Sequence, residues 1–441
     1  MDINAWINSP KTVEKSKRSY AHFDLRTDIS QQKDYIMSPS LVSKHGFYPF
    51  IHYQKNMTKY NAVKGKKPKV RDICYAAHID RCIYQYYGFL LNEIYNQRVR
   101  SEQIQDVPVA YRTDLHKNNI HFAKRAFDFI KNQNSAVIMI GDFTKFFDKL
   151  DHGYLKQQWC SLLNVKQLPA DHYAVFKNIT KYSKWELSDI LRINGLEDSL
   201  KGIRQLNERQ RVLTKEQFQK GKSAICRNSD SLGIPQGSPI SGLLANIYMM
   251  EVDKRINDMV LQKNGLYMRY SDDFIIVLPE LKHSGAIWLI KEIITIFNAT
   301  PGIELQIEKT QYFSFENRKI CNCSNEIDGK ADGRNQEVNF LGFSFDGNNI
   351  RIRAKTNSKY YYRMYRKARA ISKSGGVTPK GNPISAHNLY KRYSIKGIKN
   401  GNYFSYVKRA QNVFGDEQGE SIRRDTKRHM QKIAKAIKQQ K

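Results

Sequence analysis

Two short apolar runs flank a polar turn in the middle third of the chain. Residues 265–269 and 274–278 are rich in aromatic and β-branched side chains, and the residues between them include Asp272 and Asp273. Such runs on either side of a polar turn predict a β-hairpin with two carboxylates at its tip. Neighbouring acids are common at hairpin tips, so this pattern by itself also fits a solvated turn.

Another acid follows an apolar run of different character. Residues 136–140 are apolar without alternation, which predicts a strand buried on both faces, and Asp142 comes at its end. From Phe146 onward apolar residues recur at helical spacing, which predicts a helix with Asp148 and Asp151 on its surface. Asp142 therefore stands at a strand end, where α/β folds collect ligands, or it serves as the N-cap of that helix.

The flanking patterns complete an α+β chain. Residues 69–76 alternate basic and apolar side chains as a half-exposed strand does, and residues 79–94 follow with helical spacing. Residues 160–231 are mostly helical and polar and carry no recognisable chemistry. A Pro/Gly loop at 233–239 then leads into a Ser-capped helix, where small residues let a ligand approach the backbone closely. Alone, this loop also fits a purely structural role.

The charge of the chain indicates a polyanionic partner. The 441 residues carry a formal charge of +31, and residues 351–441 hold 24 Lys and Arg against 4 Asp and Glu. Each phosphate that a basic side chain neutralises releases condensed counterion, so phosphate contacts are expected to concentrate towards the C-terminus. General solubility is the other use of such charge.

Other features of the composition bear on localisation. The first residues do not show a basic segment followed by an apolar one, and the sequence has no apolar run of about 18 residues. The protein is therefore expected to be cytoplasmic and not membrane-bound. Six cysteines are too sparse for a disulfide framework, and Cys321 and Cys323 are the only close pair. They are expected to be reduced thiols rather than metal ligands.

Several stretches together resemble the palm motifs of reverse transcriptases. Residues 142–148, 235–241 and 270–273 occur in the order and at roughly the spacing of that family. Residues 305–310 are similar to the lysine-bearing motif that follows the catalytic hairpin, and residues 339–343 to the primer-grip turn. A joint pattern of this kind is specific, whereas a lone pair of Asp residues is not.

The resemblance extends upstream, because residues 69–85 are similar to the first fingers motif of bacterial reverse transcriptases, and it covers about residues 45–345. It implies a right-hand polymerase with fingers, an α+β palm whose antiparallel sheet packs on helices, and a helical thumb. The expected divisions are an N-terminal extension with fingers at 1–135, a palm at 136–345 with a helical insertion at 160–231, and a basic helical thumb and tail at 346–441.

The resemblance also implies a reaction, in which a 3′-hydroxyl attacks the α-phosphate of a nucleotide. Two divalent ions can stabilise the attacking and leaving oxygens of such a transfer. Asp142 and Asp272 are the expected principal ligands, and Asp273 is a supporting acid. Hard carboxylate and phosphate oxygens favour Mg²⁺ as the ion.

Residues around the acids match nucleotide-binding positions of the family. Lys69 and Arg71 match positions that hold the triphosphate of a dNTP, and Gln236 matches one that contacts the nucleotide. Phe147 matches an aromatic that collides with a 2′-hydroxyl and so favours deoxynucleotides, with a core position as the alternative. Lys309 is expected to neutralise or protonate the leaving pyrophosphate.

Contacts to primer and template are expected elsewhere. By the resemblance, Tyr270 lies beside the primer end and the primer grip includes Leu341 and Gly342. A predicted thumb helix mixes aromatics with cations suited to a duplex backbone or stacked bases, and its candidate residues are Tyr361, Arg363 and Arg366. A final helix from about residue 420 to 441 is almost entirely polar and basic, so it is expected to lie on RNA, to fray or to stay solvated.

Within the family the chain looks most similar to bacterial defence-associated enzymes, formerly grouped as abortive-infection and "unknown group" reverse transcriptases. No segment resembles an RNase H, integrase or HNH endonuclease domain. The resemblance implies cDNA synthesis on a partner noncoding RNA in antiphage defence. The alternatives are template-independent or protein-primed DNA synthesis, RNA-dependent RNA synthesis, and an RNA-binding scaffold such as an intron maturase. Intact acids at all three positions argue against a scaffold.

Overall fold

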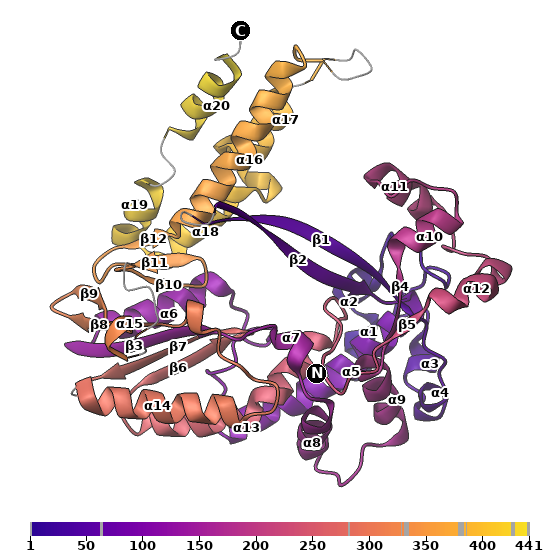
Figure 1. The fold of residues 1–441 in the computed structure, drawn as a ribbon, viewed down its shortest axis with the longest axis horizontal. Coiled ribbons are helices and arrows are strands. Elements are labelled where there is room, and N and C mark those ends of the chain that lie inside the picture. The colour runs from indigo at the N-terminus through magenta and orange to yellow at the C-terminus, as the bar shows by residue number, and fades with distance from the viewer. Residues whose placement is uncertain are drawn as a thin grey trace. The chain divides into compact units, whose positions relative to one another are not determined.

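The computed structural model describes residues 2–61, 65–280, 283–327, 329, 335–377, 383–384, 386–424 and 428–438. The chain forms two compact units. The first comprises Met1–Tyr111, Phe143–Arg255 and Ile296–Glu304, and the second comprises Arg112–Asp142, Ile256–Thr295 and Leu305–Lys441. Helices and mainly antiparallel strands occur in both units (Figure 1), so the predicted α+β class is confirmed.

The sheet of the first unit has the strand order β2-β1-β4-β5. Its antiparallel strands β1 (Phe50–Asn61) and β2 (Gly65–Tyr75) pair along their full length. β4 (Ser183–Glu186) pairs with only the first three residues of β1, and β5 (Cys226–Arg227) pairs with β4. The rest of β1 and β2 is a two-stranded ribbon (Figure 1), on which Lys55 stands directly opposite Arg71. Like charges so placed repel each other, so a bound anion would relieve this pair.

The N-terminal extension and the insertion share one hydrophobic core in the first unit. Trp185 of β4 is fully buried there, and the Phe23 ring stacks on it with centroids 5.5 Å apart. The helices of this unit are α1 (Ile3–Asn8), α2 (Pro10–Ser16), α3 (Lys33–Ile36), α4 (Pro39–Ser43), α5 (His78–Ser101), α7 (Phe146–Lys149), α8 (His152–Leu163), α9 (Ala170–Thr180), α10 (Leu187–Ile193), α11 (Leu200–Glu208), α12 (Lys215–Gly221) and the 3₁₀ turn η1 (Lys222–Ala224).

The single helix predicted after Asp142 is in fact two helices, α7 and α8. They are separated at Leu150 and Asp151, and Asp151 caps α8 by accepting a 2.8 Å hydrogen bond from the Tyr154 backbone N–H. Asp151 is therefore a capping residue, and its predicted place on a helix surface was wrong. A cap of this kind satisfies a backbone donor that the first helical turn leaves unpaired.

A five-stranded antiparallel sheet forms the centre of the second unit. Its strand order is β6-β7-β3-β8-β9, and the strands are β3 (Ser135–Asp142), β6 (Leu266–Tyr270), β7 (Asp273–Pro279), β8 (Gln311–Glu316) and β9 (Lys319–Asn322). The hairpin and the doubly buried strand predicted from sequence are both present, and Ile138 and Met139 of β3 are completely buried. Burying each such side chain contributes about 1.5–3 kcal/mol, so this strand is anchored firmly.

The second unit also contains a three-stranded sheet and most of the C-terminal helices. The strand order of this sheet is β10-β11-β12, and the strands are β10 (Val338–Phe340), β11 (Phe343–Phe345) and β12 (Ile350–Ile352). The remaining elements are α6 (Asn119–Lys131), η2 (Ile307–Lys309), α15 (Ser324–Ile327), α16 (Ala354–Lys373), α17 (Ala386–Tyr393), η3 (Ile395–Asn400), α18 (Tyr403–Phe414), α19 (Asp416–Arg424) and α20 (His429–Lys438). Helices α13 (Ser241–Leu261) and α14 (His283–Ala299) contribute residues to both units.

The predicted final helix is replaced by two helices, and the second of them is not merely polar. Ile433 and Ala436 of α20 are buried against Met364 and Ile371 of α16 and Leu389 of α17. These helices form what we call the C-terminal core, so the expectation of a frayed helix was wrong for the described part of this segment, whereas its contact with RNA stays a prediction. Residues 439–441 lie outside the described residues.

Candidate active site

The three predicted acids meet at one end of the central sheet of the second unit. Asp142, the last residue of β3, lies directly opposite Asp273, the first residue of β7. Asp272 is in the two-residue turn between β6 and β7, where Ser271 has a left-handed φ of 63°. Directly opposed residues of an antiparallel pair have Cα atoms only about 4.5–5.5 Å apart, so the register brings these carboxylates together.

Burial and mutual repulsion act on the carboxyl groups. Partial burial raises the pKa of Asp272, and the negative charge of Asp142 raises it further. The pKa of Asp273 is raised to about 7, first by desolvation and then by the charges of Asp272 and Asp142. Asp273 is an exposed residue, and it lines a pocket together with Asp142, where the surrounding groups partly desolvate its carboxyl. The site therefore holds more negative charge than it can easily stabilise.

One basic side chain offsets part of this charge. The ammonium of Lys309, in the 3₁₀ turn η2, forms an ion pair with Oδ2 of Asp142. Oδ1 of Asp142 is buried and has no hydrogen-bond partner among the residues that the structure describes. Leaving a buried carboxylate oxygen unpaired costs free energy, which a bound cation would recover.

The donor set fits a hard divalent cation that is shared with a substrate. Within the described ranges, no three His, Cys, Asp or Glu side chains are grouped closely enough to form a ready-made metal cage. Mg²⁺ seldom uses such a cage, because it usually binds through one or two carboxylates plus substrate phosphates. The unpaired oxygen of Asp142 and the repelling carboxyls of Asp272 and Asp273 suit that kind of binding.

We expect divalent-ion binding to strengthen as the pH rises through about 7, because Asp273 must lose its proton to accept a cation. The pKa of Asp273 in the folded protein lies above its ordinary value of 3.8. Without metal, the free energy of unfolding therefore falls as the pH rises from about 4 to about 7, because only the unfolded chain loses this proton there, and it falls no further above that range. Thermal melts with and without MgCl₂ should show a larger metal-induced rise in Tm at about pH 8 than at about pH 6. Asp273→Asn should flatten this difference, and an equal rise at both pH values in the wild type would contradict the assignment.

A pocket of about 560 Å³ adjoins the acids. Tyr270, Leu341 and Gly342 line it together with Asp142 and Asp273, so the structure brings these predicted primer-contacting residues to the acids. Leu341 and Gly342 form the turn between β10 and β11 and have left-handed φ values of 47° and 93°. A two-residue hairpin turn of type I′ needs positive φ at both positions, which explains the glycine.

Side chains far away in the sequence hold this turn in place. The amide of Asn119 donates a 3.0 Å hydrogen bond to the backbone oxygen of Leu341 and a 3.2 Å bond to the Tyr406 hydroxyl. The backbone N–H of Arg353 donates to the oxygen of Gly342 at 3.0 Å. Arg353 also lines the pocket, and its positive charge acts against the raised pKa of Asp273.

The predicted nucleotide loop lies in the first unit and is fixed on two sides. The backbone N–H of Cys74, in β2, donates to the oxygen of Gln236 at 2.9 Å, and the N–H of Ile234 donates to the oxygen of Phe147 at 2.9 Å. A Cβ on Gly237 would lie 2.4 Å from the Cys74 carbonyl oxygen, and Gly237 also has a φ of 118°. Only glycine fits this close approach of two backbones.

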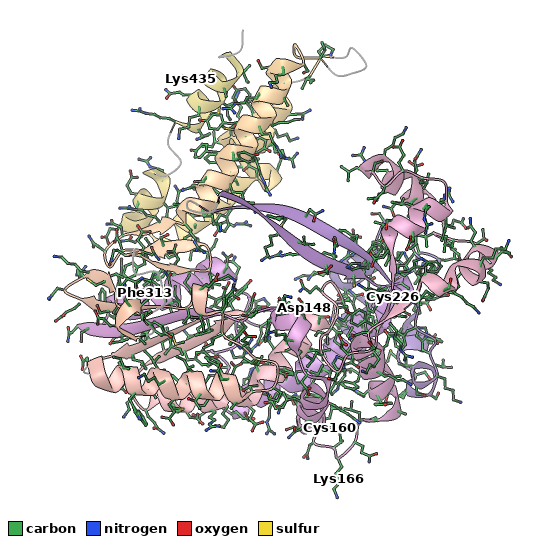
Figure 2. All side chains as sticks on the ribbon, viewed as in Figure 1. Asp148, Cys160, Lys166, Cys226, Phe313 and Lys435 are labelled. Atoms are coloured by element: carbon green, nitrogen blue, oxygen red, sulfur yellow. The ribbon has the colours of Figure 1, made fainter. Side chains whose placement is uncertain are left out.

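Asp148, which Figure 2 labels on α7, orients the side chain of Gln236. The Gln236 amide donates a 3.2 Å hydrogen bond to Oδ1 of Asp148, and partial burial raises the pKa of Asp148. Asp148 was predicted to be a helix-surface residue, and it is indeed exposed on α7, but its carboxyl also accepts a hydrogen bond from the loop. A fixed amide presents its remaining donor and acceptor in one direction, as a binding group needs.

Replacing Asp148 by alanine should therefore weaken nucleotide binding more than it slows chemistry. Losing one hydrogen bond of about 1 kcal/mol corresponds to a rise of roughly five- to tenfold in the KM for dNTP, with kcat little changed. Asp148→Asn keeps an acceptor for the Gln236 amide and should restore KM in steady-state primer extension. If Asp148→Asn is as impaired as Asp148→Ala, the orienting role is wrong.

The other predicted nucleotide contacts also belong to the first unit. Phe147 is half-buried, while its neighbour Phe146 is only 3% exposed and takes the core position. Lys69 and Arg71 lie two residues apart on β2 and therefore on the same face of the ribbon. Lys309 and the three acids are in the second unit, so the candidate residues are divided between the two units.

The predicted thumb residues lie on α16 and do not line the pocket. Tyr361 is half-buried, with the Lys432 ammonium of α20 4.2 Å from its ring centroid. Its neighbour Tyr362 is 60% exposed and has the Arg366 guanidinium 5.9 Å from its ring centroid. Arg363 and Arg366 are exposed. The aromatic face available for stacking on α16 is thus that of Tyr362, which sequence analysis did not single out.

The contributions of Asn119, Asp148 and Arg353 were also not found from sequence. The only signal for Arg353 was its position in a basic segment shortly after the primer-grip turn. Asn119 and Asp148 act through partners that are distant in the sequence, so no local pattern identifies them.

Three carboxylates and a lysine lie at the end of an antiparallel sheet, beside a pocket, which is the arrangement expected of a site of the nucleotidyl-transfer class. The particular family follows from residues 64–345, which match the reverse transcriptase (RNA-dependent DNA polymerase) family. This match covers more than half of the chain. The chain therefore belongs to the reverse transcriptase family and carries an RNA-directed DNA polymerase domain, a nucleotidyltransferase.

Individual relatives are more distant. The chain is 34% identical over 80 residues to the telomerase reverse transcriptase of Rattus norvegicus, which covers 18% of this chain and 7% of that protein. Apo telomerase from Candida tropicalis, truncated from its C-terminal domain, gives a TM-score of 0.39 at 12% identity, covering 73% of this chain and 59% of that chain. Telomerase from Candida albicans, in complex with a TWJ fragment of telomeric RNA, gives a TM-score of 0.41 at 12% identity, and the match covers 93% of this chain and 65% of that chain. This chain thus spans less than two thirds of the length of each of these relatives.

No helix in the described parts of the chain combines the length and apolar character needed to cross a membrane.

Proposed function

We propose that this protein extends a primer with deoxynucleotides on an RNA template, using two Mg²⁺ ions held by Asp142, Asp272 and Asp273. The observation that carries the proposal is the meeting of the three carboxylates at one sheet end, where Oδ1 of Asp142 has no partner among the described residues. Membership of the reverse transcriptase family supports RNA as the template.

Each group of residues has a part in this proposal. Bound Mg²⁺ would supply Lewis-acid stabilisation of the attacking and leaving oxygens. Lys309, already paired with Asp142, adds positive charge where the pyrophosphate leaves. Tyr270 and the turn at Leu341 and Gly342 hold the primer end in the pocket beside the acids.

The residues of the first unit would select the nucleotide. In this proposal Gln236 contacts the incoming nucleotide, Phe147 lies against its sugar, and Lys69 and Arg71 hold its triphosphate. The fingers then correspond to residues 1–135, the palm to 136–345 and the thumb to 346–441. On α16, Arg363 and Arg366 are exposed cations that suit a nucleic-acid backbone.

Primer extension with the purified protein tests this function. Given an RNA template, a DNA primer, dNTPs and MgCl₂, the wild type should make product, and digestion of the template with RNase beforehand should prevent it. Product that survives RNase treatment would instead indicate template-independent synthesis. Product that stays attached to the protein after denaturation would indicate protein priming, and equal use of ribonucleotides would indicate RNA synthesis.

We further propose that the template is a structured noncoding RNA and that the enzyme acts in the bacterial cytoplasm against phages. The support is the resemblance of the sequence to defence-associated reverse transcriptases, together with the formal charge of +31. Sequencing the RNA and DNA that copurify with the protein should recover one abundant RNA and its complementary DNA. Phage plating on bacteria that express the wild type should fall relative to Asp272→Ala, and equal plating on both would contradict the defence role.

A further inference from the structure

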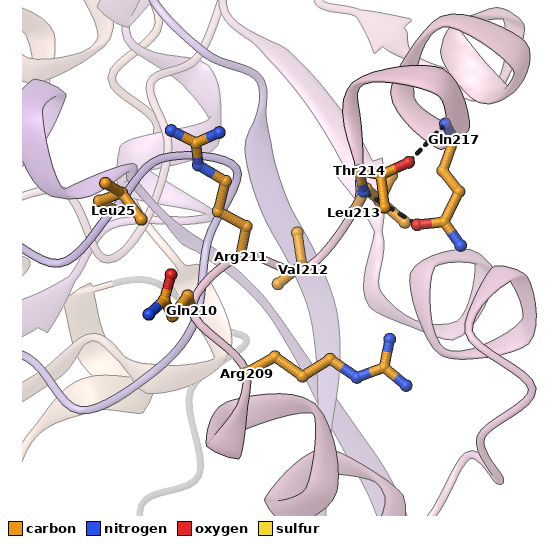
Figure 3. Close-up of a pocket in the computed structure, with 8 residues that line it drawn as sticks. All are labelled: Leu25, Arg209, Gln210, Arg211, Val212, Leu213, Thr214 and Gln217. Carbon is orange, nitrogen blue, oxygen red and sulfur yellow. Dashed lines mark hydrogen bonds between the residues drawn. The ribbon is translucent and has the colours of Figure 1, made fainter.

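A second pocket lies in the first unit, on the loop between α11 and α12. Its volume is about 450 Å³, and its lining includes Leu25 of the N-terminal extension with Arg209, Arg211, Thr214 and Gln217 (Figure 3). None of the eight described residues that line it is acidic. None is aromatic either, so the pocket has no ring on which a base could stack.

The backbone of this pocket is firmly held. The backbone N–H of Val212 donates a 2.9 Å hydrogen bond to the backbone oxygen of His22, and this bond connects the loop to the N-terminal extension. The Arg26 guanidinium donates to the backbone oxygens of Ser19 at 3.1 Å, Asn207 at 2.5 Å and Arg209 at 2.9 Å. The bonds from Arg26 occupy backbone acceptors beside the pocket. Val212 and Leu213, which also line the pocket, are buried. The lining side chains therefore stand on a rigid base.

The lining side chains present mainly hydrogen-bond donors. Oε1 of Gln217 accepts from the Thr214 N–H at 2.9 Å, and Oγ1 of Thr214 accepts from the Gln217 N–H at 3.2 Å, as the dashed lines in Figure 3 show. This reciprocal capping box fixes the Gln217 amide with its NH₂ group, which only donates, left over. The guanidinium of Arg211 is exposed and makes no hydrogen bond or ion pair with another described residue, and Arg209 is bonded to the Asn194 side chain.

We propose that this pocket binds a phosphate group of an RNA strand. A pocket without acidic lining residues, which presents the exposed guanidinium of Arg211 and the NH₂ group of Gln217, favours an anion, and guanidinium pairs well with phosphate. The absence of a stacking ring among its described lining residues favours the sugar–phosphate backbone over a base or a free nucleotide. The choice of RNA rests on the proposed function, because a polymerase that copies RNA must hold a strand of it. The pocket would anchor that strand on the insertion, which belongs to the first unit, whereas the acids belong to the second.

Salt-dependent binding of a fluorescein-labelled single-stranded RNA to the full-length protein tests this site. The slope of log Kobs against log salt becomes shallower by about 0.7 for each phosphate of a single strand that the protein no longer neutralises. Arg211→Gln should reduce the slope by that amount and weaken binding by roughly tenfold. Gln217→Glu should act in the same direction, because Glu preserves the capping box but places a negative charge in the pocket.

The matched control is Arg204→Gln, an equal change of charge at an exposed position of α11 outside the pocket. It should leave the slope near that of the wild type. If Arg204→Gln acts as strongly as Arg211→Gln, or if neither pocket variant changes the slope, the site is overturned. If inorganic phosphate raises the Tm of the wild type but not of Arg211→Gln while RNA slopes are equal, the pocket binds a small anion and the RNA assignment is overturned.

Binding and polymerisation are measured separately, so the two proposals can fail separately. A wild type that makes no DNA on RNA, but whose RNA-binding slope responds to Arg211→Gln and not to Arg204→Gln, would reject the polymerase function and keep the pocket. Normal DNA synthesis with slopes that do not respond would reject only the pocket.

Discussion

Asp272→Asn should abolish DNA synthesis while leaving the fold as stable as that of the wild type, or more stable. The substitution removes a carboxylate that is expected to bind the metal ions. The transition state would then lose about several kcal/mol of stabilisation, which corresponds to a fall of roughly 10³-fold or more in kcat. The substitution also removes a negative charge that the site holds poorly, since burial and Asp142 raise the pKa of this group. Primer extension and thermal melts without metal, at a pH above 7, measure the two effects.

A matched substitution separates the role of this acid from a general effect of charge. Asp258 is an exposed residue of α13 in the same unit, and it does not line the pocket. Asp258→Asn should retain wild-type primer extension. If Asp272→Asn retains synthesis within a few-fold of the wild type, the acid is not a metal ligand. If it instead unfolds the protein, the site is less strained than the pKa shifts indicate.

Phe147→Ala should allow the enzyme to incorporate ribonucleotides. The ring is half-buried and is not needed in the core, because Phe146 fills that position, so its removal opens space at the nucleotide without a large cavity in the core. Discrimination by a single steric contact is commonly worth 1–3 kcal/mol, so the preference for dNTP over rNTP should fall by roughly 10- to 200-fold. Competition between the two nucleotide types in primer extension measures it.

Phe146→Ala is the informative comparison for this prediction. The side chain of Phe146 is buried, and deleting it should lower the free energy of unfolding by about 3–5 kcal/mol without a selective gain of ribonucleotides. A wild-type enzyme that already uses both nucleotide types equally would remove the reason to assign a sugar-selecting role to Phe147.

The acids of the site could be located from the sequence because each sits at a boundary that local patterns mark. The unbroken apolar run before Asp142 and the paired runs around Asp272 and Asp273 correspond to the observed strands β3, β6 and β7. Their meeting depends on one long-range fact, the register that sets Asp142 opposite Asp273. Resemblance to a family supplied the expectation that the acids act together, but neither it nor the periodicity predicted the register.

Other parts of the site depend on partners that no local pattern reveals. Gln236 and Asp148 are 88 residues apart, and Asn119 and Leu341 are 222 apart, so neither hydrogen bond has a signature along the chain. The break between α7 and α8 was missed because the apolar spacing continues across it, while the capping role of Asp151 depends on backbone conformation. In α20, Ile433 and Ala436 are one helical turn apart, but the many basic residues around them dominated the average polarity.

The packing of α20 also decides how the protein can be handled in the laboratory. A chain shortened before Ile433 would uncover Met364, Ile371 and Leu389 of the C-terminal core, and an exposed apolar patch of that kind promotes aggregation. Deletions intended to remove the basic C-terminal residues would therefore lower solubility instead of raising it. Replacing exposed lysines of α20, such as Lys435 (Figure 2), by glutamine removes charge while the apolar side of the helix stays covered.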